Sequence, residues 1–231
     1  MKNTFGKQAI QFFQNLTLDI KLPNGVRVMN PYRNPKIMGY TSAFFRQFFW
    51  DKNPRVLVFG INPGRFGAGI TGITFTDPVA LEEYCGIPND LAKKRELSSI
   101  FIYKFIRVWG GPKKFYKNFY LTAVSPLGFL KDSKNYNFYD HPKLLKNIEP
   151  FLVKSIKSQI NFGAYQEAAI VLGTGKIKQV FNTLNKKYNF FKNIYSIEHP
   201  RFIMQYRRKK LPYFIKKYRK VFLQAKNICK R

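Results

Sequence analysis

The sequence is poor in cysteine. Its 231 residues include only Cys85 and Cys229, which lie far apart along the chain. Zinc and iron–sulfur sites built from thiolates need about four cysteines, so such sites are excluded. A disulfide between two lone cysteines is not expected in a reducing compartment. Acidic pairs such as Glu82-Glu83 have no histidine or cysteine directly beside them. The sequence therefore predicts no metal site and no cofactor.

Long apolar runs are also missing. No segment approaches the roughly 20 consecutive apolar residues that cross a bilayer. Residues 1–6 lack the long apolar stretch and the small-residue cleavage site of a signal peptide. We therefore expect a cytoplasmic protein without a membrane partner.

Acidic residues are few. The chain has 12 of them against 41 lysines and arginines, which gives a formal net charge of +29. An AT-rich gene raises the number of lysines, but it does not readily explain so few carboxylates. A charge of this size favours a polyanionic partner, most simply a nucleic acid. Apolar residues make up 45% of the chain and aromatic residues 17%, which is typical of a globular rather than a disordered protein.

Short apolar segments predict four buried strands, at residues 55–61, 119–124, 168–175 and 193–197. Segments with helical spacing lie at residues 96–108, 142–159 and 176–187, and from residue 200 to the C-terminus with a break at Pro212. This alternation predicts an α/β fold: one three-layer domain over residues 1–231, with helices on both sides of a central four-stranded parallel sheet. We expect residues 1–50 to pack on this domain as a helical and extended segment, with helices at 4–15 and 41–50 and with turns and extended chain at 21–35.

Polar residues lie at the ends of three predicted strands: Asn62, Ser125 and His199. The carboxyl ends of parallel strands meet at one edge of the sheet, where α/β proteins bind ligands. His199 precedes Pro200, and proline is common at the first position of a helix. A histidine at such a place can donate a hydrogen bond to an oxygen that gains negative charge, with support from the helix dipole. A lone histidine is more often structural, however, and Asn62 can simply cap the turn before Pro63, so the residues alone leave both interpretations open.

A glycine-rich loop follows the first strand and runs as GINPGRFGAGITGITF over residues 60–75. It lacks the Gly-Lys-Ser/Thr ending of a phosphate-binding P-loop. Asn62 stands where the dinucleotide-binding fingerprint needs a glycine. A nucleotide-binding enzyme is therefore the least favoured interpretation of this loop.

The loop resembles the first motif of the uracil-DNA glycosylase superfamily, in its SMUG-type branch (single-strand-selective monofunctional uracil-DNA glycosylases). That motif is Gly-x-Asn-Pro-Gly-x-Phe-Gly, followed by x-x-x-Thr-Gly-x-x-Phe, and every letter is present here without gaps. The resemblance extends over residues 55–206 and implies a bacterial DNA glycosylase with the fold of that superfamily. Such an enzyme flips a deaminated base out of DNA and removes it by hydrolysis, without lyase activity.

The resemblance also implies roles for single residues. Asn62 would position the attacking water. His199, in a His-Pro pair like the one that begins the family's second motif, would stabilise the departing base. Phe75 would stack on the flipped base. The pocket around that base would further include Pro63, Gly64, Phe66, Ala123 and Ser125.

The second motif departs from the family, because the Ser-Pro that normally follows His-Pro is missing here. The apolar residues Phe202, Ile203 and Met204 are candidates for the wedge that fills the gap left by the flipped base. The other expected DNA contacts are polar or basic side chains nearby: Arg201, Gln205, Arg207, Arg208, Lys209 and Lys210. We expect a monomer that acts on DNA, at the nucleoid of a bacterium.

One further departure bears on the substrate. At the position of Ala123 the family has an asparagine that reads the edge of uracil, whereas alanine offers no side-chain hydrogen bond. We therefore expect a less selective pocket, which accepts uracil and admits xanthine or hypoxanthine. The alternative is a basic DNA-binding protein that kept the fold without catalysis. Asn62, Phe75 and His199 together argue against this alternative, while Ala123 and the shortened second motif argue for it.

Overall fold

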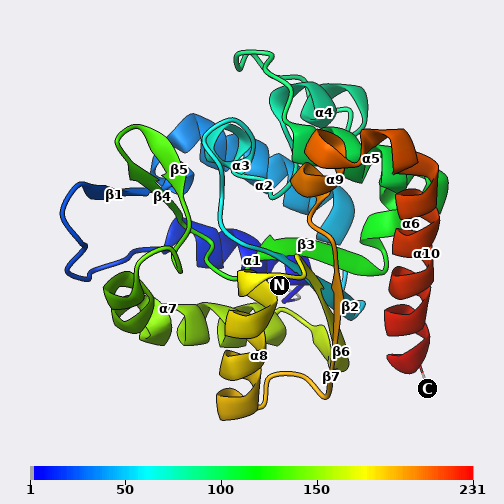
Figure 1. Cartoon of the computed structure of the whole chain (residues 1–231). Coiled ribbons are helices and arrows are strands. Elements are labelled where there is room, and N and C mark those ends of the chain that lie inside the picture. The colour runs from blue at the N-terminus through cyan, green and yellow to red at the C-terminus, as the bar shows by residue number, and fades with distance from the viewer. Residues whose placement is uncertain (1–2, 231) are drawn as a thin grey trace.

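The computed structural model describes residues 3–230, and the expected parallel sheet lies at its centre (Figure 1). The strands of this sheet run in the order β3-β2-β6-β7, and all neighbours are parallel. β2 and β3 are buried along their whole length, as expected for strands inside a parallel sheet. The strand bounds are β2 (Arg55–Gly60), β3 (Phe119–Ala123), β6 (Ala164–Leu172) and β7 (Asn193–Ile197).

Helices cover both faces of the sheet, which confirms the three-layer α/β arrangement. On one face, the ring of Phe222 in α10 lies 4.9 Å from that of Phe119 in β3. On the other face, the ring of Phe181 in α8 lies 4.9 Å from that of Phe59 in β2. The first of these layers also contains α5 and the second α7 (Figure 1). The bounds are α5 (Leu97–Trp109), α7 (Pro142–Asn161), α8 (Lys176–Tyr188) and α10 (Leu211–Ile228).

The N-terminal segment packs on this core through α1 (Phe5–Gln14) and α2 (Pro35–Phe49). The ring of Phe5 lies 5.3 Å from that of Phe49 and 5.2 Å from that of Tyr120 in β3. α2 begins earlier than the expected start at residue 41. The reason is an N-cap that the prediction did not use: the Asn34 side chain accepts a hydrogen bond from the Lys36 N–H at 2.9 Å.

A second sheet, which the sequence analysis did not predict, lies beside the first. β1 (Val26–Met29), inside the segment expected to form turns and extended chain, pairs antiparallel with β4 (Gly128–Lys131). β4 pairs in turn with β5 (Lys134–Tyr136). The two residues between β4 and β5 have φ angles of 50° and 58°, as in the type I′ turns that favour tight hairpins. This β4–β5 hairpin forms one wall of the site described below.

The expected C-terminal helix is divided into α9 and α10. Pro212 lies in the first turn of α10, where proline is tolerated, and does not interrupt a longer helix. None of the helices described in the structure is long and apolar enough to cross a membrane. The remaining elements are short: η1 (Pro31–Arg33), α3 (Ala68–Thr71), α4 (Pro78–Glu83), α6 (Pro112–Tyr116), α9 (Pro200–Tyr206) and η2 (Arg208–Lys210).

Candidate active site

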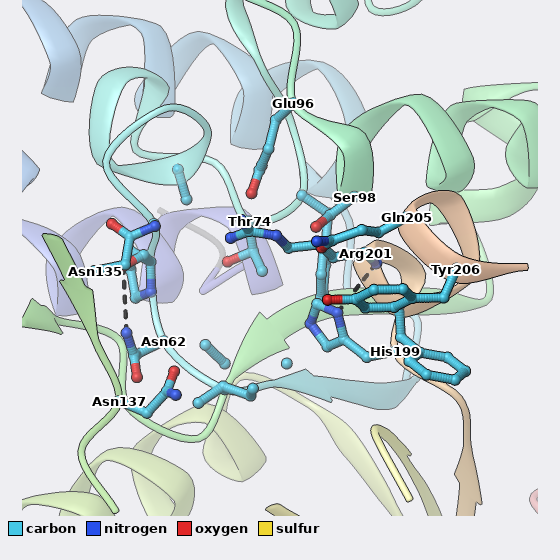
Figure 2. A pocket seen from close by; sticks show the side chains of 18 residues that line it. Asn62, Thr74, Glu96, Ser98, Asn135, Asn137, His199, Arg201, Gln205 and Tyr206 are labelled. Carbon is cyan, nitrogen blue, oxygen red and sulfur yellow. Dashed lines mark hydrogen bonds between the residues drawn. The ribbon is translucent and has the colours of Figure 1, made fainter. Parts of the chain in front are cut away.

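A pocket of about 370 Å³ opens at the carboxyl edge of the parallel sheet, where β2, β3 and β7 end (Figure 2). The expected residues that line it are Asn62, Pro63, Gly64, Phe75, Ala123, His199, Arg201, Phe202 and Gln205. The pocket also has polar side chains that the sequence analysis did not single out: Thr74, Glu96, Ser98, Asn135, Asn137 and Tyr206. The sheet edge thus brings together residues from both sequence motifs, and the hairpin and α5 complete the walls.

Asn62 is held by main-chain atoms of the segment that follows the hairpin. Its Nδ2 donates to the carbonyl oxygens of Pro63 and Tyr136, both at 3.3 Å. Its Oδ1 accepts from the N–H of Phe138 at 3.4 Å. Two carbonyl acceptors on one side and an N–H donor on the other leave a single sensible orientation of the amide. A carbonyl oxygen has two lone pairs, so Oδ1 can still accept a hydrogen bond from a water in the pocket.

His199 lies on the other side of the pocket, at the N-cap of α9 (Figure 2). Its Nδ1 accepts from the backbone N–H of Arg201 at 3.2 Å. Burial, with the positive charge of Arg201, lowers the pKa of His199 to about 4. The ring is therefore neutral at physiological pH, and because Nδ1 is the acceptor its proton is on Nε2. His199 can offer a neutral N–H donor to a group in the pocket.

The turn that carries His199 is fastened to α10. The Tyr218 hydroxyl donates to the carbonyl oxygen of Glu198 at 2.5 Å. The Lys217 ammonium bonds the Glu198 carboxylate at 2.6 Å. These two contacts fix the main chain immediately before the histidine, so the imidazole is positioned by the fold before any ligand arrives.

Phe75 forms the floor beside His199, with the two ring centroids 5.8 Å apart. Its φ angle of 58° is unusual for a residue other than glycine. A Cβ at Gly60 would come within 2.7 Å of the Phe75 ring, so the first glycine of the motif makes room for this ring. The Thr71 hydroxyl, which bonds the carbonyl of Thr76 at 2.6 Å, closes the loop around it. The Thr-Gly-x-x-Phe part of the motif thus holds the Phe75 ring in the pocket wall.

Glu96 is an unexpected carboxyl group in the pocket wall, at the start of α5 (Figure 2). A Cβ at Gly67 would lie 2.0 Å from its Oε2, so the carboxyl is packed directly against the glycine loop. Burial and the charge of Asp77 raise the pKa of Glu96 to about 7, although Arg201 and Ser98 act in the opposite direction. No local sequence pattern distinguishes this glutamate from an ordinary acidic residue at a helix start. Tyr206 could have been found, because it follows Phe202 by four residues on one helix.

Several predicted residues lie outside the pocket. Phe66 lines a neighbouring groove instead. Ser125 is fully buried, and its hydroxyl donates to the carbonyl of Leu127 at 2.7 Å, so the structure does not bring it to a ligand. Ile203 and Met204 are buried in the core and cannot act as a wedge, whereas Phe202 is 40% exposed at the pocket mouth. The basic residues beyond α9 lie exposed outside the pocket: Arg207, Arg208, Lys209 and Lys210.

The side chains of the pocket differ from those of a metal centre. Among residues 3–230, no three histidine, cysteine, aspartate or glutamate side chains are grouped as metal ligands would be. The polar groups of the pocket are amides, hydroxyls, one imidazole, one guanidinium and one carboxyl. This set suits the recognition of a small polar ring and the stabilisation of negative charge.

Comparison with known proteins places the chain in a family and finds a similar solved structure. The chain matches the family model of the uracil DNA glycosylase superfamily over residues 47–223. It is also similar to the crystal structure of wild-type SMUG2 from Pedobacter heparinus, with 40% sequence identity and a TM-score of 0.94. That match covers 97% of this chain and 99% of the other. Among the curated proteins no relative matches.

Proposed function

Because the chain belongs to the uracil-DNA glycosylase superfamily, we propose that it is a monofunctional DNA glycosylase. It hydrolyses the N-glycosidic bond of a deaminated base that is flipped out of DNA, and it leaves an abasic site. The observation that carries this proposal is the pairing of Asn62 and His199 on two sides of one pocket, with the Phe75 ring beside His199. Without these three side chains the same fold would serve DNA binding alone.

The chemistry follows from the charges that develop. As the bond to the base breaks, the sugar gains positive charge and the base gains negative charge. The neutral His199 donates its Nε2–H to an oxygen of the departing base, and Arg201 next to it adds positive potential. Fixed donors aimed at developing negative charge are among the largest contributions to catalysis. No acid with a pKa near 7 is needed at this position, because the departing base is stabilised as an anion.

Asn62 positions the nucleophile, which is a water molecule. An amide is too weak a base to remove a proton from water, so it acts by holding the water in place through Oδ1. The water then adds to a sugar that already carries most of its positive charge. The main-chain contacts of Asn62 keep the water on the side of the pocket opposite His199, as displacement at one carbon requires.

The range of bases follows from Ala123 at the end of β3, which lines the pocket with a methyl group only. The pocket therefore accepts uracil, and it also accepts xanthine or hypoxanthine, whose purine rings need more room. Phe202 serves as the wedge that fills the gap in the base stack, since it is the exposed apolar residue of α9 beside the pocket. The basic residues 207–210 hold DNA phosphates around it.

Base release from labelled oligonucleotides tests this proposal. Wild-type protein should produce alkali-labile abasic sites at uracil, xanthine or hypoxanthine. His199→Ala should lower the single-turnover rate by about 10²- to 10³-fold, the usual cost of removing one donor to a developing anion. Asn62→Ala removes the acceptor that holds the water and should lower the rate by about 10²-fold or more. Their affinity for the same DNA should stay nearly unchanged.

The second histidine offers a matched control. His141 also precedes a proline at a helix N-cap, and its Nδ1 also accepts a backbone N–H two residues on, from Lys143 at 3.1 Å. It lies outside the pocket. His141→Ala should therefore keep full activity. Equal losses in both histidine variants would point to folding rather than chemistry. Tight DNA binding without cleavage of any substrate by the wild type would favour the non-catalytic alternative.

A further inference from the structure

A second hollow of about 470 Å³ joins the base pocket at its mouth. The two share Glu96, Asn135 and Arg201, so they form one continuous surface. We propose that this groove binds the nucleotide next to the flipped one, with its base stacked on Phe66 and its phosphate held by Arg65, Lys134 and Arg201. This inference rests on the proposed function, because it assigns the neighbouring nucleotide of the same substrate. The volume of the groove is within the range of about 300–1,000 Å³ that is typical of small-molecule sites.

Phe66 is the platform. Its side chain is 40% exposed, and it is not part of the buried core. The Arg65 guanidinium lies 4.5 Å from the ring centroid, and the Lys94 ammonium lies 5.7 Å from it. Both cations lie over the ring, so a base stacks on the part of the ring that they leave exposed. Exposed aromatic rings beside cations bind unpaired nucleobases, since every base has a π-face and an adjacent phosphate.

The platform is fixed before DNA arrives. The backbone N–H of Arg65 donates to the Asn135 side chain at 3.0 Å, and the Arg65 guanidinium bonds the carbonyl of Ser133. Both partners belong to the β4–β5 hairpin, whose tight turn also brings Lys134 into the groove. Because these contacts already order the loop, little conformational entropy is lost on binding.

The charge of the groove fits a phosphate backbone. Arg95 is bound to the Glu83 carboxylate at 2.9 Å. In contrast, Arg65, Lys134 and Arg201 form no ion pair with any carboxylate that the structure describes. Unpaired cations beside an aromatic face favour a nucleotide over an uncharged aromatic ligand.

The groove also specifies the form of the DNA. A base that lies flat on Phe66 is separated from its neighbour in the strand and from its partner in a duplex. The groove therefore suits a single strand better than a duplex.

The test first removes the base next to the uracil while the protein stays unchanged. It then combines this change with the loss of the Phe66 ring. Single-stranded oligonucleotides carry one uracil, with an intact neighbour or with a tetrahydrofuran abasic residue on its 5′ or its 3′ side. For wild type, one of the two replacements should lower kcat/KM by about 5- to 150-fold, as expected for the loss of one base–aromatic stack. Phe66→Ala should lose a similar factor on the intact oligonucleotide and lose nothing more on the abasic one. Phe66→Tyr should restore the sensitivity to the neighbour.

The assignment is overturned if the losses in kcat/KM multiply when Phe66→Ala acts on the oligonucleotide with the abasic neighbour. It is also overturned if Phe66→Ala keeps the wild-type kcat/KM on the intact oligonucleotide. Trp50→Ala is the matched control. Trp50 is 50% exposed and has an arginine, Arg46, 5.9 Å from its ring, but it precedes β2 at the end of the sheet opposite the pocket. Dissociation constants for the same oligonucleotides, measured by fluorescence anisotropy, separate the two proposals. If the wild type releases no base, the proposed glycosylase function fails, and the same coupling between Phe66 and the neighbouring base in the dissociation constants still decides the groove.

Discussion

The carboxyl group of Glu96 should make the stability of the protein fall as the pH rises from about 4.5 to about 7. Burial and the charge of Asp77 raise the pKa of this group from 4.5 to about 7 in the folded protein. In the unfolded chain the pKa returns to its ordinary value. The folded protein therefore binds the proton more tightly, so the stabilising effect is fully present below pH 4.5 and is lost as the pH rises toward 7.

The size of the effect follows from the two pKa values. The difference between 4.5 and about 7 corresponds to about 3 kcal/mol, because each pKa unit is worth about 1.4 kcal/mol. Glu96 touches solvent at the pocket wall, which reduces this figure to about 2 kcal/mol. Glu96→Gln keeps the shape of the neutral acid and cannot ionise. The free energy of unfolding of this variant should exceed that of wild type by about 1 kcal/mol at pH 5 and by about 2 kcal/mol at pH 8.

Urea denaturation of both proteins at pH 5 and pH 8 measures this difference. Glu149→Gln is the control, since hydrogen bonds from Lys187 and Tyr188 lower the pKa of Glu149 and keep it ionised at both values. Its difference from wild type should be the same at the two pH values. An equally constant difference for Glu96→Gln would refute the argument that the fold holds this carboxyl in a cavity that favours its neutral form.

Two other substitutions test the pocket and the core. Ala123→Asn places an amide at the end of β3, so excision of xanthine and hypoxanthine should fall more than about tenfold relative to uracil in an oligonucleotide assay; a parallel loss for all three bases would contradict the proposed role of this position. Arg55 is fully buried, packs against the rings of Phe5 and Phe49 and bonds Asp51 at 2.9 Å. It also donates to the carbonyl oxygens of Phe48 and Tyr116. Arg55→Met leaves these acceptors without their donor and should lower the free energy of unfolding by about 1–3 kcal/mol in urea denaturation, and an unchanged free energy would show that these contacts are dispensable.

The sequence was sufficient for the central sheet and for the residues at its edge, because both depend on local patterns. β2 and β3 are short apolar runs, and the ends of parallel strands converge wherever the helices pack. Asn62 and His199 could therefore be placed in one site although they lie far apart in the chain. Phe75 was assigned to the same site, and the close approach of its ring to Gly60 explains why the motif needs both residues.

The rest of the site depends on tertiary contacts that leave no local pattern. Asn135 lies in β5, a strand of three residues that exists only because it pairs with β4. The turn between these strands is Asp132-Ser133, which lacks the glycine by which type I′ turns are usually predicted. Ser125 was misjudged for a related reason: its place at a strand end was visible, but its burial was not.

The way Asn62 is held shows how one fold can keep its chemistry while its DNA preference changes. The hairpin segment orients the Asn62 amide through main-chain atoms only, the carbonyl of Tyr136 and the N–H of Phe138. It contacts the neighbouring groove through side chains, among them Lys134 and Asn135. Substitutions of those side chains can therefore change which strand is bound without moving the amide. Surface hairpins tolerate such changes better than buried strands do, so side chains of the proposed groove can change while the main-chain contacts of Asn62 stay in place.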